Sequence, residues 1–310
     1  MTCTGLAAAP NDHWGMVGMG QWQLALNLQH GRRGCSFSQL FGLTLIAAFP
    51  LGMRRPPPST KLAYSETMIY QCFHKPFARA THCQWVRPIG VGGYTEEGML
   101  SDASGDNISA LNPYYNELTA LYWIWKNTDD PWVGLYHYRR VLAFKYDKTW
   151  ADPFGFTIDA SDFVFDYFFN EEQFSALTDL MSVSDVVMPR MRVIEGTVAD
   201  HYRRVHDADS WQVFGQVLHE MRPDLAGYLV LFERTNLSTA FNMFVMRRDT
   251  FHHYCSDLFA VINEVFRRIG PREDFYLKRY PGFLAERFLT LWMRVNVLRV
   301  AEVPYVRIDG

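Results

Sequence analysis

From Met68 onward the chain alternates short apolar segments with longer segments whose apolar residues recur every three or four positions. The short segments are rich in β-branched and aromatic residues, which favour strands, whereas the longer ones predict helices with one buried face. Strands are predicted at residues 68–73, 132–139, 185–189, 240–246 and 297–300. Helices are predicted at residues 113–126, 171–181, 197–206, 210–221, 224–233, 250–268 and 283–295. Strands separated by helices predict an α/β domain with a mixed sheet flanked by helices.

The first 66 residues are a different kind of sequence and lack a clear period. They contain an uncharged run at residues 34–53, followed by two arginines and a proline triplet. This run has the length of a membrane span but is only weakly apolar. Three alternatives stay open for residues 1–66: a poorly ordered or non-native extension, a membrane-associated segment, or a signal peptide. Translation that starts at Met68 is a further hypothesis, and the folded domain is expected at residues 67–310.

Composition argues against two classes of protein. Lys and Arg total 30 and Asp and Glu total 33, giving a net charge of -3, whereas a nucleic-acid binder would carry a basic excess. The 5 cysteines form no C-x-x-C pair, so neither a disulfide framework nor a zinc ribbon is expected. Aromatic residues make up 15% of the chain. Many will be core, but this excess also suits a sugar-binding cleft, because apolar sugar faces stack on flat rings.

The sharpest motif is Gly-Leu-Tyr-His-Tyr-Arg-Arg at residues 134–140. It ends a predicted strand and so places four side chains at the carboxyl end of the sheet, where α/β folds bind ligands: His137, Tyr138, Arg139 and Arg140. Guanidinium groups match phosphate oxygens in shape and charge. The motif therefore predicts a clamp for a diphosphate, and the alternative is a solvated strand end.

A polar loop and a helical pair offer further candidates. The loop at residues 101–109 contains Asp102, Asp106 and Asn107, which could accept hydrogen bonds from sugar or ribose hydroxyls or could form Asx turns. Tyr202 and His206 lie one helical turn apart, so they share a face and either pair inside the fold or take part in catalysis.

Two acidic motifs have competing interpretations. The pair Asp207 and Asp209 forms the one D-x-D of the sequence, and paired carboxylates can hold a divalent ion against a diphosphate. A helix cap or turn is the default interpretation, because about one such pattern is expected by chance in a chain of this composition. Glu286 precedes Arg287 early in an apolar helix, where the two form either a buried ion pair or an acid or base in a cleft.

The order of these segments resembles a bacterial domain-of-unknown-function family of capsular and exopolysaccharide glycosyltransferases. The resemblance covers most of the chain, from Met68 to about Val303, and rests mainly on two strings. One is residues 134–140, and the other is Asn-Glu-Leu-Thr-Ala-Leu-Tyr-Trp-Ile-Trp-Lys-Asn at residues 116–127. Shorter matches are His74-Lys75-Pro76, residues 106–109, Tyr202 with His206, residues 242–244, and Glu286-Arg287 with Trp292.

The resemblance implies a GT-A-like fold that binds a nucleotide sugar, with a UDP-sugar as the expected donor and a growing surface or capsular polysaccharide, lipid-linked or free, as the acceptor. Such folds usually present a metal-binding D-x-D after the corresponding helix and strand, whereas this chain presents residues 137–140. That departure puts a divalent Mn²⁺ or Mg²⁺ in doubt. We therefore predict that Arg139 and Arg140 offset the charge of the leaving diphosphate.

We favour displacement at the anomeric carbon, and this mechanism suggests roles for other residues. Glu286 and Asp106 are the candidate bases for deprotonating the acceptor hydroxyl. The other substrate-binding candidates are His74 and Lys75 near the nucleotide, Asn242 and Met243 near the acceptor, and Asp102, Asn107, His137, Tyr138, Tyr202, His206 and Arg287. A cytoplasmic location is expected, with peripheral attachment to the inner membrane left open.

Two other functions remain as alternatives. One is a carbohydrate-binding module that keeps the cleft but performs no chemistry. The other is a different sugar-nucleotide enzyme, such as a nucleotidyltransferase, which should carry a glycine-rich phosphate loop with a lysine. Residues 88–93 are glycine-rich but contain no lysine.

Overall fold

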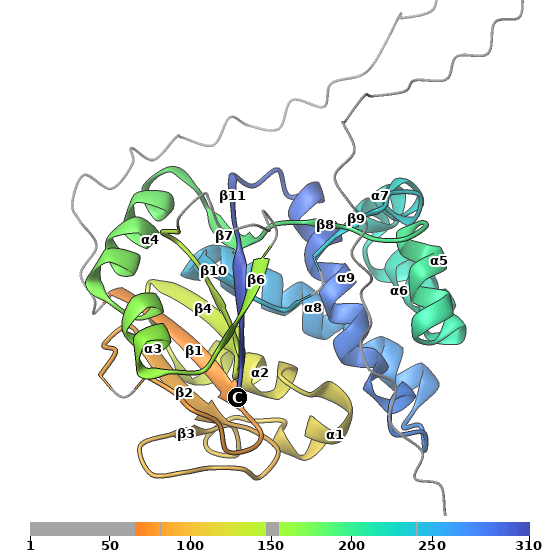
Figure 1. Ribbon diagram of the computed structural model, residues 1–310. Coiled ribbons are helices and arrows are strands. Elements are labelled where there is room, and N and C mark those ends of the chain that lie inside the picture. The colour runs from red at the N-terminus through yellow and green to blue at the C-terminus, as the bar shows by residue number, and fades with distance from the viewer. Residues whose placement is uncertain (1–65, 81, 147–154, 240) are drawn as a thin grey trace, which may run out of the picture. The chain divides into compact units, whose positions relative to one another are not determined.

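The computed structural model describes residues 66–80, 82–146, 155–239 and 241–310 (Figure 1). The expectations for residues 1–66 therefore fall, except at Glu66, outside the described residues. Within the described ranges, no helix has both the length and the apolarity that crossing a bilayer requires.

A mostly parallel sheet lies at the centre of the domain (Figure 1), and its main path has the strand order β11-β7-β10-β4-β1-β2-β3. These strands are β1 (Thr67–Phe73), β2 (Val86–Gly90), β3 (Leu100–Ser101), β4 (Trp132–His137), β7 (Val186–Pro189), β10 (Phe244–Arg247) and β11 (Val300–Val303). β10 runs antiparallel to β4 and β7, whereas the other neighbours are parallel. The carboxyl ends of β1, β2, β4 and β7 therefore meet at one edge, and β10 begins there.

Three further strands extend the sheet from β4: β5 (Arg140–Leu142), β6 (Gly155–Asp159) and β12 (Tyr305–Asp309). β12 pairs antiparallel with β5 and parallel with β6. β5 follows β4 after a turn at Tyr138 and Arg139, and His137 pairs with Arg140 across that turn. The strand predicted at residues 132–139 is thus too long, because the chain reverses after His137. A separate two-stranded sheet contains β8 (Arg192–Val193) and β9 (Leu237–Ser238).

Alternate residues of the central strands are buried on opposite faces of the sheet. In β1, Met68, Tyr70 and Cys72 join one hydrophobic cluster, while Ile69 joins another. Both faces are therefore covered, as expected for mainly parallel strands, which are hydrophobic on both sides. The predicted α/β domain with a mixed sheet flanked by helices is confirmed.

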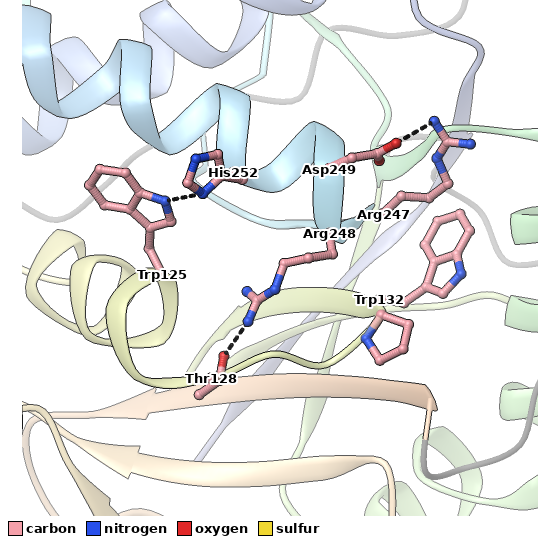
Figure 2. A pocket seen from close by; sticks show the side chains of 8 residues that line it. Trp125, Thr128, Trp132, Arg247, Arg248, Asp249 and His252 are labelled. Carbon is pink, nitrogen blue, oxygen red and sulfur yellow. Dashed lines mark hydrogen bonds and ion pairs between the residues drawn. The ribbon is translucent and has the colours of Figure 1, made fainter.

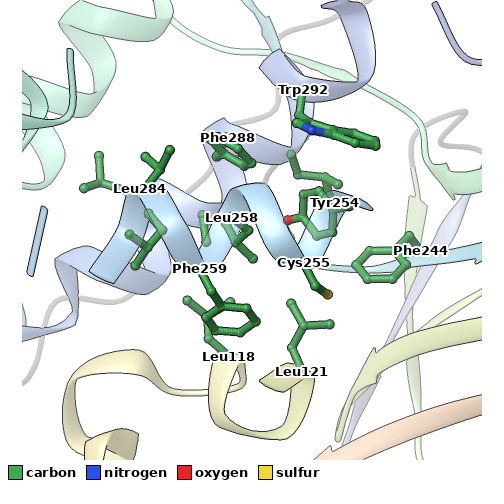
Figure 3. Packing of buried hydrophobic residues seen from close by; sticks show 14 of the residues in the cluster. Leu118, Leu121, Phe244, Tyr254, Cys255, Leu258, Phe259, Leu284, Phe288 and Trp292 are labelled. Atoms are coloured by element: carbon green, nitrogen blue, oxygen red, sulfur yellow. The ribbon is translucent and has the colours of Figure 1, made fainter. Parts of the chain in front are cut away.

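Helices cover the two faces unequally. The helices are α1 (Asn112–Tyr115), α2 (Leu118–Asn127), α3 (Asp162–Phe168), α4 (Glu171–Val183), α5 (Val198–Val205), α6 (Ala208–Met221), α7 (Pro223–Glu233), α8 (Arg248–Ile269) and α9 (Tyr280–Val295). α3 and α4 pack on one face and the others on the opposite face. Figure 3 shows α8 between α2 and α9, where Leu121, Leu258 and Phe288 are fully buried. Burying each such side chain contributes about 1.5–3 kcal/mol.

The helix predicted at residues 113–126 is two helices, α1 and α2, separated by a sharp bend. Asn116 lies at the bend with a φ of 51°. α9 passes so close to it that a Cβ on Gly282 would lie 2.9 Å from Asn116 Nδ2. The glycine and the bend together let α9 approach, and they place Glu117 between the two helices at the sheet edge.

The sequence prediction fails at two other places. The glycine-rich residues 88–93 begin with a proline, a composition that favours a loop, yet β2 occupies Val86–Gly90 and includes Pro88 within the sheet. Tertiary pairing with β1 overrides the local proline and glycine signals. The final strand is predicted at residues 297–300, but Val297 has a φ of 49° and β11 starts only at Val300. Strands β5, β6 and β12 and helix α3 are not predicted from the sequence.

Candidate active site

A small cavity, here called the carboxyl-edge cavity, lies where the parallel strands end, and its volume is about 70 Å³. Its walls come from the end of β4, the segment before β10, the bend between α1 and α2, the short 3-10 helix Leu277–Arg279, and α9. The lining residues are Glu117, Tyr136, His137, Arg140, Phe241, Asn242, Met243, Arg279 and Glu286. Five candidates from the sequence therefore come together here: His137, Arg140, Asn242, Met243 and Glu286.

Glu286 is the acidic group with the most perturbed environment in this cavity. Its side chain is 19% exposed, and burial raises its pKa to about 7 even though the neighbouring Arg287 acts to lower it. Arg287 Nη1 donates to Glu286 Oε2 at 2.5 Å, so the ion pair considered from the sequence is present. A carboxyl group with a pKa near neutrality can accept a proton at physiological pH and release it again.

Guanidinium groups give the cavity its positive side. Burial lowers the pKa of Arg140, the neighbouring Arg139 lowers it further, and Glu286 opposes both effects. Arg140 Cζ lies 4.8 Å from the ring centre of Phe241, which holds its planar group against the wall. The Nε atoms of Arg139 and Arg279 are buried and make no hydrogen bond within the described residues. Buried donors without partners are costly, and an anionic ligand would satisfy them.

The ring of Tyr138 contacts polar side chains that follow β1 and β4. Its ring makes an edge contact with His74 at 4.8 Å between centroids, and Lys75 Nζ lies 5.4 Å from its ring centre. Arg139 Cζ lies 5.6 Å from the same ring. Burial, followed by nearby positive charges, holds the pKa of His137 well below its usual range, so this imidazole is neutral. The two chain segments identified from the sequence thus meet at one edge.

Glu117 and Arg279 line the cavity but were not site candidates from the sequence. Asn242 Nδ2 donates to Glu117 Oε1 at 2.8 Å, and Asn242 is 4% exposed. Its Oδ1 atom is buried and accepts no hydrogen bond within the described residues. Glu117 lies in one of the two strings behind the family resemblance, but no local pattern distinguishes it. Arg279 carries no sequence signal, because only the tertiary fold brings it to β4.

A chain of hydrogen bonds extends from Glu286 to the surface. Arg287 Nη2 contacts His206 Nε2 at 3.1 Å, and His206 Nδ1 contacts Tyr276 Oη at 2.9 Å. Burial lowers the pKa of His206 to about 2, so the ring is neutral. Arginine has only donors, so Nε2 accepts and Nδ1 carries the proton and donates to Tyr276. Tyr202 is fully buried beneath this chain, and Arg287 Cζ lies 5.3 Å from its ring centre.

Comparisons with known proteins identify the family of the chain and one similar solved structure. Residues 68–297 match the family described as a domain of unknown function, DUF4422. The chain belongs to the DUF4422 family. One solved structure, the apo form of the WbbM bifunctional glycosyltransferase, is similar to this DUF4422 chain with a TM-score of 0.70 and 28% sequence identity. The match covers 79% of this chain and 46% of that one, so this chain spans less than half of its length.

No curated protein matches the sequence. The likeness to WbbM shows that the DUF4422 domain has a GT-A-like fold, as the sequence predicts, and that it is related to glycosyltransferases.

In this DUF4422 domain the loop at residues 101–109 has internal partners. Both carboxylate oxygens of the buried Asp102 accept hydrogen bonds, from Ser109 Oγ at 2.7 Å and from Thr119 Oγ1 at 2.6 Å. Asp106 accepts from the hydroxyl of Tyr122 at 3.1 Å. Both aspartates therefore have side-chain partners within the fold, although these are not the bonds of an Asx turn, and neither is among the residues that line the carboxyl-edge cavity.

Asn107 differs from the two aspartates because it bonds to the backbone of its own loop. Its Nδ2 donates to the carbonyl of Gly105 at 2.9 Å, and its Oδ1 accepts from the backbone of Ser109 at 3.2 Å. These are the bonds of an Asx-type turn. A substrate-binding role for Asn107, Asp102 and Asp106 stays a prediction.

The D-x-D motif caps a helix. Asp207 precedes α6, and its side chain accepts from the backbone N–H of Asp209 at 3.2 Å. Arg272 Nη2 also pairs with Asp207 at 2.8 Å.

The carboxyl-edge cavity is a poor fit for a divalent ion, which prefers several oxygen ligands. Among its lining residues the carboxylates are Glu117 and Glu286, and each is already bonded to a nitrogen donor. Across the described ranges, no group of three or more His, Cys, Asp or Glu side chains is placed to hold a metal ion.

A larger hollow, here called the amino-edge pocket, lies at the other end of β4 and has a volume of about 740 Å³ (Figure 2). It is lined by Trp125, Thr128, Pro131, Trp132, Arg247, Arg248, Asp249 and His252. Figure 2 shows that these side chains mostly bond to one another: Trp125 Nε1 donates to His252 Nδ1, and Arg248 Nη2 donates to Thr128 Oγ1. None of its lining residues is a site candidate from the sequence.

Proposed function

We propose that this chain is a glycosyltransferase domain that moves a hexose from a nucleotide-sugar donor to a saccharide hydroxyl. The observation that carries the proposal is the carboxyl-edge cavity, where Glu286, with a pKa raised to about 7, faces the guanidinium groups of Arg140 and Arg279. This cavity lies where α/β sheets bind ligands, and the chain resembles the WbbM glycosyltransferase in fold and sequence.

The diphosphate of the donor binds the cationic side of the cavity. Arg140 and Arg279, which line the cavity, and the adjacent Arg139 supply planar donors, and among the described residues the Nε atoms of Arg139 and Arg279 are buried without a hydrogen-bond partner. Guanidinium groups bind phosphate oxygens bidentately, and in a site sheltered from water they stabilise the charge that develops on the leaving diphosphate. We propose UDP-sugars as the donor class, with His74 and Lys75 near the nucleotide.

Glu286 acts as the base. The acceptor hydroxyl donates a hydrogen bond to its carboxylate, and the acceptor oxygen attacks the anomeric carbon of the donor. As the new C–O bond forms, the proton moves to Glu286 and the bond from the anomeric carbon to the diphosphate oxygen breaks. The leaving electron pair stays on that oxygen, beside the guanidinium groups. A base whose pKa lies near the working pH is efficient because it is both ionised and basic.

The part of the cavity wall formed by Asn242 and Glu117 holds the sugars. Among the described residues Asn242 Oδ1 is buried without a donor, and Glu117 Oε1 lies 2.8 Å from Asn242 Nδ2, so the two residues offer acceptors for sugar hydroxyls. Their placement beside Glu286 supports contact with the sugar that reacts. We propose that the acceptor is a growing surface polysaccharide and that the reaction takes place in the cytoplasm, at or near the inner membrane.

The experiment is a transfer assay on the full chain with a panel of UDP-, GDP- and dTDP-sugars, with either EDTA or Mn²⁺ present. Nucleotide release is followed by chromatography. We expect slow hydrolysis of one donor class by the wild-type protein, retained in EDTA and lost in Glu286→Gln. Binding of free glycan without any donor hydrolysis would contradict the proposal and favour a carbohydrate-binding module. Hydrolysis that requires Mn²⁺ would contradict the arginine-based account of the diphosphate.

A further inference from the structure

Three rings contact one another near the carboxyl-edge cavity, and the outer pair, Tyr276 and Phe283, is tilted by 36° with centroids 5.0 Å apart. His206 and Tyr276 are nearly parallel, with an interplanar angle of 15° and centroids 5.8 Å apart. His206 and Phe283 are also stacked, at 23° and 4.1 Å. Tyr276 is 40% exposed, whereas Phe283 is 9% exposed. The cluster of His206, Tyr276 and Phe283, here called the aromatic platform, therefore reaches solvent through Tyr276.

The aromatic platform lies directly beside the reacting groups. Phe283 and Glu286 are three residues apart on α9, so their side chains are neighbours on one helix face. Arg279 Cζ lies 5.2 Å from the ring centre of Phe283, and Arg279 lines the cavity. The three rings are not among the residues that line the cavity, and Arg279, which contacts Phe283, connects the platform to it.

We infer that the aromatic platform binds the apolar face of the acceptor saccharide and so presents its hydroxyl to Glu286. This inference rests on the proposed glycosyl transfer and names the acceptor side of the same site. Pyranose rings have one face rich in C–H groups, and such faces pack on aromatic rings that keep a polar handle. Tyr276 offers both an exposed ring and a hydroxyl.

The platform is also connected to the base by directed hydrogen bonds. His206 donates from Nδ1 to Tyr276 and accepts at Nε2 from Arg287, and Arg287 in turn donates to Glu286. Because Arg287 donates at both ends, the neutral His206 fixes its orientation and thereby the position of Glu286. Tyr276 is thus an acceptor-binding residue through its ring and a positioning residue through its hydroxyl.

Two variants of Tyr276 separate these roles. Tyr276→Ala removes the ring, and we expect the acceptor KM to rise about tenfold with the donor KM unchanged. Tyr276→Phe keeps the ring, and we expect the acceptor KM to stay within about twofold while kcat falls about fivefold because the bond to His206 is lost. The acceptors are octyl glycosides of glucose, galactose, mannose and N-acetylglucosamine. Phe163→Ala is the matched control, because Phe163 is an aromatic of α3 that is 70% exposed.

The outcomes distinguish the platform from the proposed function. An unchanged acceptor KM in Tyr276→Ala, with donor hydrolysis intact, would overturn the platform alone, whereas wild-type protein that hydrolyses no donor would count against the glycosyltransferase proposal. Saturation-transfer NMR with methyl glycosides and UDP measures acceptor binding without turnover. We expect signals from the sugar ring protons with wild type and Tyr276→Phe and their loss with Tyr276→Ala, and equal signals in all three would reject the platform.

Discussion

The two hollows at opposite ends of β4 differ in their chemistry, and the smaller one contains the more perturbed titratable group. Trp132 lines the amino-edge pocket and His137 the carboxyl-edge cavity, about 17 Å apart at the usual rise of a strand. The first hollow has about 740 Å³ and the second about 70 Å³. Both contain guanidinium nitrogens that are buried and have no hydrogen-bond partner in the described part of the chain. The larger hollow nevertheless lacks, among its lining residues, a buried carboxyl group.

The carboxyl groups show what the difference means. Asp249 in the amino-edge pocket has a side chain that is 65% exposed and pairs with Arg247 at 3.2 Å. Glu286 in the carboxyl-edge cavity is held with a pKa near neutrality by burial. Strand direction explains the contrast, because the parallel strands all deliver their following loops to the same edge. Charged and titratable side chains therefore gather where several chain segments meet at the carboxyl edge of the sheet, even though the cavity there is the smaller of the two.

The largest expected effect is the loss of the base. Glu286→Gln keeps the shape and the hydrogen bond with Arg287 but cannot accept the proton, so kcat should fall about 10³-fold with little change in donor KM. Initial rates of nucleotide release at saturating donor measure this. Asp249→Asn in the amino-edge pocket is the matched control and should stay within about twofold of wild type. Equal losses in the two variants would break the comparison between the hollows.

The next effect concerns the diphosphate. Arg140→Ala should lower kcat/KM for the donor about 100-fold, because a charge-assisted hydrogen bond to phosphate is lost, and the double variant R139A/R140A should show no transfer. Arg248→Ala removes a guanidinium group from the amino-edge pocket and should leave donor kinetics near wild type. Circular dichroism confirms that each variant is folded. Full activity in the double variant would reject the diphosphate clamp.

The sequence anticipates this site unevenly, for physical reasons. β1, β4 and α9 carry strong apolar patterns, which predict His74 after the first strand, His137 late in the next and Glu286 early in the helix, and the structure brings His137 and Glu286 to the same cavity. Arg279 could not be predicted, because it reaches the cavity only through the packing of α9 against the bend between α1 and α2. Periodicity also does not reveal where a strand stops, so it extends β4 through the turn at Arg139.

A third effect is on stability. Burial raises the pKa of Glu286 from 4.5 to about 7, so the folded protein resists its ionisation. Below pH 4.5 the group is protonated in both states. Between pH 4.5 and 7 only the unfolded state loses the proton, so wild-type stability falls in this window and levels off above it.

Glu286→Gln lacks this dependence. Its free energy of unfolding relative to wild type should therefore rise by about 2–3 kcal/mol between pH 4.5 and 7.5. Urea unfolding of both proteins across this range gives the difference, and Asp249→Asn provides a control with an exposed carboxylate. If the difference in unfolding free energy between wild type and Glu286→Gln did not change with pH, the carboxyl group would not be buried as described. The two hollows would then not differ in the environment of their carboxyl groups.

The smallest expected effect concerns Asp102, a buried carboxylate whose hydrogen bonds are already made within the fold, in contrast to the cavity groups that lack partners among the described residues. Asp102 is 1% exposed at the same sheet edge, but both of its oxygens already accept bonds from Ser109 and Thr119. Asp102→Asn keeps one acceptor and should cost about 1–2 kcal/mol of stability while donor kcat/KM stays within about threefold. Urea unfolding and donor kinetics measured on the same preparation separate the two outcomes. A loss of activity without a loss of stability would instead support the substrate-binding role predicted for Asp102 from the sequence. In that case, internal hydrogen bonds to a side chain at this edge would not be evidence that its role is structural.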